Sequence, residues 1–280
     1  MKNPALAVLL ITLISACATS PTGRKQLMLV SEQQAISESK QAYLQTMGKL
    51  SSEGKLVTDP KLLKRVDTIT GRLIAQAIIM RPATQTWEWS VEVIDDPKTV
   101  NAWCMAGGRM AIYTGLIQKI DPTDAELAQV MGHEISHALA NHTAERMSVA
   151  MASQLGVIAV GVGTNSAGKM AAAQGLAIVA ISLPNSRTAE TEADRIGIEL
   201  AAKAGYDPRA AATLWQKMEK VGGDGPPQFL STHPAPGNRQ ATLAALEPQM
   251  MPYYEQPGTR PVYQLARPMT APAAKKKNSP

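Results

Sequence analysis

Cysteine is almost absent from this sequence, which holds two cysteines, Cys17 and Cys104, among 280 residues. Because Cys17 belongs to an expected lipid anchor described below, Cys104 is left without an intramolecular partner. This excludes the class of small secreted domains that disulfide bonds hold together. We therefore expect Cys104 to be a small, buried apolar residue.

Aromatic side chains are also few, at 4% of the residues, whereas alanine and the 14 methionines are plentiful. This mixture favours helices. With 45% hydrophobic and 18% charged residues, the composition is that of a globular protein. Long repeats and Gly-rich phosphate-binding loops are both missing, and the patterns below predict an α+β, mainly α, chain with a small β-sheet.

The folded body lacks a large excess of charge of one sign. The net charge is +5, but most of it comes from Lys2, in an expected leader, and from three consecutive lysines at 275–277 in the tail. Basic residues do not alternate with aromatic ones. These features exclude nucleic acid as a partner.

Long apolar runs are missing too, and the apolar stretch at the N-terminus is short. The chain begins MKNPALAVLLITLISACATS, with a basic Lys2, apolar residues at 5–14, and then Ser15 and Ala16. A membrane-spanning helix needs about 20 apolar residues. The order of basic, apolar and small residues instead predicts a signal peptide over residues 1–16.

The end of this signal, ISAC, resembles the bacterial lipobox. That resemblance implies that the thiol of Cys17 receives a diacylglycerol group, and that the protein is held at the membrane through this lipid anchor. Ala18, which stands where an Asp would retain a lipoprotein in the inner membrane, implies sorting to the outer membrane. Ordinary secretion with an unmodified cysteine is the alternative.

Residues 17–30 are expected to form a lipidated tether, residues 31–252 a single domain, and residues 253–280 a disordered, Pro-rich basic tail. Ser31, Asp59 and Thr123 each precede a helical pattern as its N-cap. Strands are expected in TWEWSVEVIDD and RMAIYTGLI. The other expected helices cover 150–182 as a pair or a hairpin, 188–203, 207–220, and a segment after Pro236. A hairpin over 150–182 that dips into the membrane is a minority alternative.

The segment GHEISHALANH, residues 132–142, holds three of the four histidines in the chain. On the predicted helix, His133 and His137 lie one turn apart on the same face, within reach of a single ion. Glu134 is displaced by about 100° around the axis and can reach a water molecule without occupying a ligand position. The spacing is the HExxH arrangement of zinc peptidases. The alternative is a buried helix with incidental imidazoles.

A catalytic zinc site needs a third protein ligand and an open position. The helical segment SRTAETEADRIG supplies carboxylates, of which Glu190 and Asp194 share one face while Glu192 points elsewhere. We assign Glu190 as the third ligand. Asp194 is assigned as the acceptor for the free N–H of a ligand histidine, which orients the ring. A solvated acidic face is the alternative.

The HExxH motif with a downstream E-x-x-x-D is the gluzincin pattern. Three further segments, SR..E..AD, NAW…GG followed by YTGL, and STHPAPGNR, resemble the HtpX and CaaX-prenyl-protease family of zinc endopeptidases over about residues 60–245. The resemblance implies a zincin-like metalloprotease domain with one Zn²⁺ per subunit. Together with the lipobox, it is nearest to a periplasmic lipoprotein branch that includes the β-barrel assembly-enhancing protease. The residues before the glycines, WCMA, depart from the family.

The remaining candidates are His142, His233 and Arg239. His142 is turned by about 140° from His137 on a continuous helix, so we expect it to be structural or exposed. By resemblance, the loop that carries His233 lies over the zinc. His233 is then either a fourth ligand that caps the metal or a donor to the oxyanion. Arg239 is assigned to anchor that loop or the substrate carbonyl.

The function implied is hydrolysis of peptide bonds by an endopeptidase, with Glu134 as general base. The substrates implied are proteins or peptides, such as misfolded envelope proteins, and outer-membrane assembly proteins are possible partners. RMAIYTGLI is expected to offer a sheet edge to an extended substrate. Two alternatives are a latent or chaperone-like envelope lipoprotein and a non-proteolytic zinc hydrolase.

Overall fold

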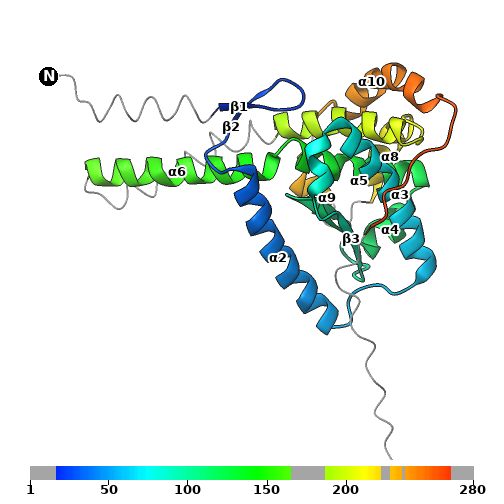
Figure 1. The fold of residues 1–280 in the computed structure, drawn as a ribbon, viewed down its shortest axis with the longest axis horizontal. Coiled ribbons are helices and arrows are strands. Elements are labelled where there is room, and N and C mark those ends of the chain that lie inside the picture. The colour runs from blue at the N-terminus through cyan, green and yellow to red at the C-terminus, as the bar shows by residue number, and fades with distance from the viewer. Residues whose placement is uncertain (1–16, 165–186, 222–227, 235–236, 266–280) are drawn as a thin grey trace, which may run out of the picture.

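The structure, a computed structural model, describes residues 17–164, 187–221, 228–234 and 237–265 (Figure 1). Helices dominate it, as the composition predicts. The helices are α2 (Glu32–Ser52), α3 (Pro60–Met80), the 3-10 helix η1 (Pro82–Thr86), α4 (Thr114–Ile120), α5 (Asp124–Leu139), α6 (His142–Thr164), α8 (Ala210–Lys220), α9 (Gln228–Thr232) and α10 (Arg239–Tyr254). Residues 187–203 are also helical. The α+β, mainly α, fold class is thereby confirmed.

The predicted N-caps of three helices are confirmed. Ser31 accepts a hydrogen bond from Gln34 N at the start of α2, and Asp59 accepts one from Lys61 N at the start of α3. At α5, Thr123 and Glu126 form a complete capping box. Each cap satisfies a backbone N–H that the first turn leaves without a partner.

The main sheet has three strands, β3 (Ser90–Ile94), β4 (Ala102–Met105) and β5 (Arg109–Tyr113). β5 is the middle strand, parallel to β3 and antiparallel to β4. The prediction that RMAIYTGLI offers a sheet edge is therefore wrong, because β5 is paired on both sides and TGLI begins α4. In this sheet β4 is an outer strand, and it contacts α5.

α5 lies in the centre of the body, in contact with α3, β4, α6 and α8. Every residue of α5 from Glu126 to Leu139 is buried. After Leu139 the chain turns at Asn141, whose φ of 56° is in the left-handed region, and α6 begins at His142. The histidine-rich segment therefore spans two helices rather than one.

The helix over 187–203 approaches α5 backbone to backbone. A Cβ atom on Gly197 would lie 2.9 Å from His133 N, and one on Gly132 would lie 3.0 Å from Gly197 O. Neither position leaves room for a side chain. The two glycines thus set the distance at which the acidic residues of this helix face the histidines of α5.

The segment 17–30, expected to be a tether, contains a small antiparallel hairpin of β1 (Cys17–Thr19) and β2 (Lys25–Leu27). β2 contacts α6, which runs outward beside the hairpin in Figure 1. Gln26 is buried and donates to Ala140 O at 2.8 Å. The hairpin is therefore docked on the body next to the junction of α5 and α6.

The C-terminal segment was expected to be disordered from about residue 253. Instead, α10 continues to Tyr254, and residues up to 265 pack against α3. Tyr263 N donates to Gly71 O at 3.0 Å, and a Cβ on Gly71 would lie 2.6 Å from Tyr263 O. Partly buried Tyr263 and Leu265 pack against the core, which explains their order. Residues 266–280 lie outside the described part.

In the described ranges, none of the helices is long and apolar enough to cross a membrane. Of the two helices expected over 150–182, residues up to Thr164 continue α6, and the remainder lies outside the described residues.

Candidate metal centre

The two histidines of the HExxH motif face each other's ring nitrogens on α5. His133 Nε2 and His137 Nε2 are 3.0 Å apart, and both residues are buried. This is the geometry expected from their spacing of four positions. The helix therefore presents two imidazole nitrogens to one point in space.

Glu190 and His233 complete the group from two other segments. Glu190 Oε2 lies 3.1 Å from His133 Nε2, and its Oε1 lies 3.3 Å from His137 Nε2. His233 Nδ1 is 3.1 Å from Glu190 Oε1. One nitrogen or oxygen atom from each of the four residues lies within 4.8 Å of the others.

This set fits zinc by its donor chemistry. Imidazole nitrogens with one carboxylate are a common ligand set for catalytic zinc. Glu190 Oε2 is buried and lies 3.1 Å from His133 Nε2 and 3.6 Å from Arg239 Nη2, but it accepts no well-aligned hydrogen bond from a described residue. A buried carboxylate oxygen without a hydrogen-bond donor is costly unless a cation binds it. Burial opposes ionisation of Glu190, but its close contacts with the rings of His133, His137 and His233 outweigh it and lower the pKa of this carboxyl group.

Glu134 lies beside the group without belonging to it. Its Oε1 is buried without a hydrogen-bond partner among the described residues and lies 3.4 Å from His233 Nε2. Burial raises the pKa of Glu134 above its ordinary value. A carboxylate with a raised pKa binds a proton more readily at neutral pH, as a general base must.

Asp194 and Arg239 support His133 from behind. Asp194 Oδ1 lies 2.9 Å from His133 Nδ1, the position expected for an acceptor of the ring N–H. Arg239 Nη2 donates to the same oxygen at 2.5 Å, and its guanidinium carbon stands 3.4 Å from the ring centroid of Trp215. The structure thus places Arg239 against Asp194, whose carboxylate it holds. Its assigned role as an anchor of the His233 loop or of the substrate carbonyl stays a prediction.

His142 does not turn away from the ligand pair, so the expected direction and the exposed alternative are both wrong, while the structural alternative still stands. His142 is buried, and its Nδ1 lies 2.8 Å from His137 Nδ1. The expectation counted positions along one continuous helix, but the left-handed turn at Asn141 ends α5 and redirects the chain. His142 therefore contacts the back of His137 much as Asp194 contacts the back of His133.

Glu192 is a residue of the site that the sequence analysis set aside. It does face away from Glu190, and there its Oε2 lies 3.2 Å from His142 Nε2. The sequence did hold a signal for it: the helix carries three acidic residues, at 190, 192 and 194, and the segment 132–142 carries three histidines, so each histidine could have been given an acidic partner. Arg24, which donates to Glu192 at 2.7 Å, could not have been found from helix periodicity.

His233 is held by its own short helix. His233 follows α9 directly; its N donates to Phe229 O in that helix, and its ring stacks on Phe229 with centroids 4.6 Å apart. Phe229 N in turn donates to Val100 O, next to β4. This anchoring brings a residue 100 positions from His133 to the metal centre.

The two cysteines have different outcomes. Cys104, on β4, is buried and free of a disulfide bond, and burial raises the pKa of its thiol well above the ordinary value. The prediction that Cys104 is buried is confirmed. The lipidation of Cys17 stays a prediction.

Comparison with known proteins gives a family match. A sequence profile described as Peptidase family M48 matches residues 60–247. The chain is 40% identical over 173 residues to the mitochondrial metalloendopeptidase OMA1 of Arabidopsis thaliana, covering 60% of this chain and 34% of that protein. It is 31% identical over 247 residues to human mitochondrial OMA1, covering 82% and 45%.

A bacterial relative is also similar. The chain is 29% identical over 217 residues to the beta-barrel assembly-enhancing protease of Escherichia coli, covering 72% of this chain and 42% of that protein. The matches therefore span between a third and a half of these relatives' own lengths. The profile match covers HExxH, Glu190, Asp194, His233 and Arg239.

Proposed function

The chain belongs to peptidase family M48, and on that basis we propose that it is a zinc-dependent metalloendopeptidase. The observation that carries the proposal is the convergence of His133, His137, Glu190 and His233 from three segments on one buried point. Glu134 lies beside that point with a free carboxylate oxygen. The four convergent groups and the free carboxylate are what metal-assisted hydrolysis requires.

His133, His137 and Glu190 are the proposed zinc ligands, and zinc bound there would supply a Lewis acid for the scissile carbonyl and for a water molecule. Glu134 then takes the proton of the attacking water and delivers it to the leaving amine. Its burial and raised pKa suit both transfers. Asp194, held by Arg239, keeps His133 in the tautomer whose Nε2 lone pair faces the centre.

His233 has two possible roles, and its position supports either. Its Nδ1 lies near Glu190 and His133, as a fourth ligand would, while its Nε2 lies 3.4 Å from Glu134. A capping ligand keeps the resting enzyme latent, whereas an N–H donor stabilises the oxyanion. The substitution His233→Ala separates them, because removal of a cap raises the cleavage rate and removal of an oxyanion donor lowers it.

We place the substrate backbone along β4 rather than β5. β4 is an outer strand of its sheet and contacts the helix that carries HExxH. An extended peptide that pairs with an outer strand is bound through main-chain hydrogen bonds, which tolerate many sequences. This suits an endopeptidase that acts on misfolded or misassembled proteins.

We further propose that the protein acts in the bacterial periplasm, anchored to the outer membrane through Cys17, in the lipoprotein branch of the family. The lipobox-like ISAC and the following Ala18 support this location. The similarity to a protease named for β-barrel assembly supports envelope proteins as substrates and outer-membrane assembly proteins as partners. The mitochondrial relatives share the peptidase region, and the proposed location rests on the N-terminal sequence instead.

A latent or chaperone-like lipoprotein is the second candidate function. The observation that favours it is the position of His233 within the metal centre, where a capping side chain would block the open position. Such a protein would still bind unfolded envelope proteins through its outer strand.

The test compares the full-length protein in detergent with its Glu134→Gln variant on casein. Peptidase activity predicts casein fragments from the unmodified protein and a rate lower by about 10²–10⁴-fold in the variant, the usual contribution of a general base. Equal cleavage by both proteins would show a contaminant. Absence of cleavage in both, with full complementation of a deletion strain by both, would favour the second candidate.

A further inference from the structure

The N-terminal hairpin reaches the metal centre through a line of four side chains. Arg24 Nε donates to Glu192 Oε2 at 2.7 Å, and that oxygen lies 3.2 Å from His142 Nε2. His142 Nδ1 lies 2.8 Å from His137 Nδ1. These contacts join the turn of the β1–β2 hairpin, the helix over 187–203, α6 and α5.

The carboxylate of Glu192 fixes the direction of the hydrogen bonds that lead from it through His142 to His137. An ionised carboxylate only accepts, so the atom of His142 that faces Glu192 must be the Nε2–H donor. In the neutral ring, Nδ1 of His142 then has only a lone pair and must accept. His137 therefore donates from Nδ1–H, which leaves its Nε2 lone pair directed at the metal centre.

We propose that Arg24 is a positioning residue of the metal centre, which acts through Glu192 and His142 to fix the ring tautomer of His137. This inference rests on the proposed function, in which His137 binds zinc. It gives His137 a support that matches the one Asp194 and Arg239 give His133. It also makes the hairpin that begins at Cys17 part of the active site.

On the side of Glu192 that faces away from His142, the described donors to its carboxylate come from the hairpin. Thr22 Oγ1 donates to its Oε1 at 2.5 Å, and Arg24 Nε donates to its Oε2. Arg24 also makes a bidentate pair with Glu145, at 2.7 and 2.6 Å. Without Arg24, Glu192 loses the charged donor that sets its rotamer, and His142 loses a fixed acceptor.

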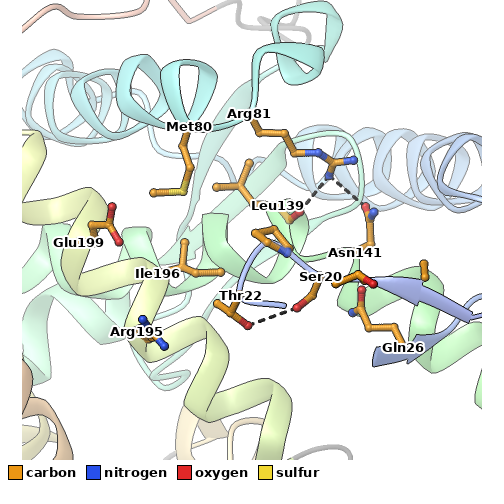
Figure 2. A pocket seen from close by; sticks show the side chains of 13 residues that line it. Ser20, Thr22, Gln26, Met80, Arg81, Leu139, Asn141, Arg195, Ile196 and Glu199 are labelled. Atoms are coloured by element: carbon orange, nitrogen blue, oxygen red, sulfur yellow. Dashed lines mark hydrogen bonds between the residues drawn. The ribbon is translucent and has the colours of Figure 1, made fainter. Parts of the chain in front are cut away.

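On its side toward the helix over 187–203 the hairpin packs loosely, because a cavity of about 600 Å³ lies there. Figure 2 shows Ser20 and Thr22 of the hairpin on one side of this cavity and Met80 and Ile196 on the other. Continuous apolar packing therefore does not hold this side of the hairpin. The polar contacts of Thr22 and Arg24 with Glu192 join it to the helix over 187–203.

The first test reads the tautomer itself and needs no bound metal. With only four histidines in the chain, ¹⁵N-histidine labelling of the full-length protein gives a small set of imidazole nitrogen signals. We expect His142 to be the Nε2–H tautomer in the unmodified protein and a mixture in Arg24→Gln. Glu192→Gln should also give a mixture, since an amide can donate as well as accept. An unchanged His142 tautomer in both variants would overturn the proposal.

The second test is zinc affinity, measured by competition with a chelator, together with the visible spectrum of the Co²⁺ form. Outer partners of metal ligands commonly change affinity by 10–100-fold, and we expect a loss of about 10-fold in Arg24→Gln with partial recovery in Arg24→Lys. Loss of thermal stability in Arg24→Gln with unchanged zinc affinity and Co²⁺ spectrum would show a merely structural contact and overturn the proposal.

Two control variants are available, one at a second partner of Arg24 and one on the exposed surface of the hairpin. Glu145→Gln weakens the docking of the hairpin but leaves the Arg24–Glu192 contact, so its zinc affinity should stay within about 2-fold, well below the usual outer-shell effect. Lys25→Gln, an exposed change on the same hairpin, should have no effect. A loss in Glu145→Gln equal to that in Arg24→Gln would refute the positioning role. If the unmodified protein binds no zinc, the proposed function fails, while the tautomer measurement still decides this inference.

Discussion

At the scale of single residues, the two histidine ligands proposed for zinc are each oriented by a hydrogen-bond partner at the ring nitrogen that faces away from the metal centre. His133 has the carboxylate of Asp194 at its Nδ1, and His137 has His142 at the same atom. A hydrogen bond at Nδ1 sets the tautomer of a ligand imidazole and orients its ring. The chemistry of the centre therefore depends on residues that need not touch the metal.

Asp194→Asn tests this support at His133. The amide keeps the size of the side chain but weakens its interaction with the ring N–H and with Arg239, so zinc affinity should fall by about 10–100-fold. Chelator competition measures the change. Glu199→Gln, on the same helix and paired with Lys203, is the control and should leave affinity unaltered. Equal affinities of Asp194→Asn and the unmodified protein would contradict the assigned role.

The residues that could be predicted from the sequence are those with a fixed spacing. His133, Glu134 and His137 follow from one helical turn, and Glu190 and Asp194 from another. The position of His142 could not be predicted, because the left-handed residue Asn141 changes the chain direction between His137 and His142. Spacing arguments hold only within one continuous element.

At the scale of elements, the contact between α5 and the helix over 187–203 determines how far Glu190 lies from His133 and His137. Gly132 and Gly197 let the two backbones meet at His133. Because the contact is made by backbone atoms, it cannot adjust by a rotamer change. The distance between Glu190 and the two histidines depends on it.

Gly197→Ala tests this close approach. A Cβ atom 2.9 Å from His133 N must push the helices apart, which costs about 1–3 kcal/mol of stability and weakens zinc binding. Thermal unfolding and chelator competition measure the two effects. Gly237→Ala, where nothing lies within 4 Å of the added atom, is the control. Normal zinc affinity in Gly197→Ala would show that the approach does not position Glu190.

The capping box of α5 predicts a pH-dependent contribution to stability. Burial opposes ionisation of Glu126, but hydrogen bonds from Lys217, Thr123 and Thr213 outweigh it and lower the pKa of its carboxyl group. A carboxyl group with a lowered folded pKa stabilises the fold above its unfolded pKa, and this is lost as the pH falls through the folded pKa.

Glu126→Gln should therefore lower the free energy of unfolding by about 1 kcal/mol at neutral pH, the usual value of a helix cap. The difference from the unmodified protein should shrink as the pH is lowered below about 4. Urea unfolding at several pH values measures it, with the exposed Glu219→Gln as control. A difference that does not change with pH would rule out the ionised carboxylate as its source.

At the scale of the whole molecule, the order of two segments near the chain ends could not be predicted from the sequence. The β1–β2 hairpin and residues 255–265 have weak periodicity, so composition suggested a tether and a tail. Both are ordered by contacts with distant parts of the chain, the hairpin through Arg24 and the C-terminal segment through α3. Long-range contacts of this kind leave no local pattern in a sequence.

The order of the strands in the sheet could not be predicted from the sequence either. The two predicted strand segments contain β3 and β5, but the pairing of β5 on both sides follows from β4, which lies in the short segment between them. A four-residue strand with Gly107 and Gly108 after it resembles a turn in the sequence. The position of the outer strand, and with it the proposed substrate path, therefore came from the structure.

The central claim is that this fold holds one zinc ion at the point where α5, the helix over 187–203 and His233 meet. The most direct measurement is the zinc content of the purified full-length protein beside that of its His133→Ala variant, with thermal unfolding to show that both are folded. The account predicts about one zinc per chain in the unmodified protein, as in other catalytic sites of this type, and almost none in the variant. Equal zinc content in the two folded proteins would contradict it.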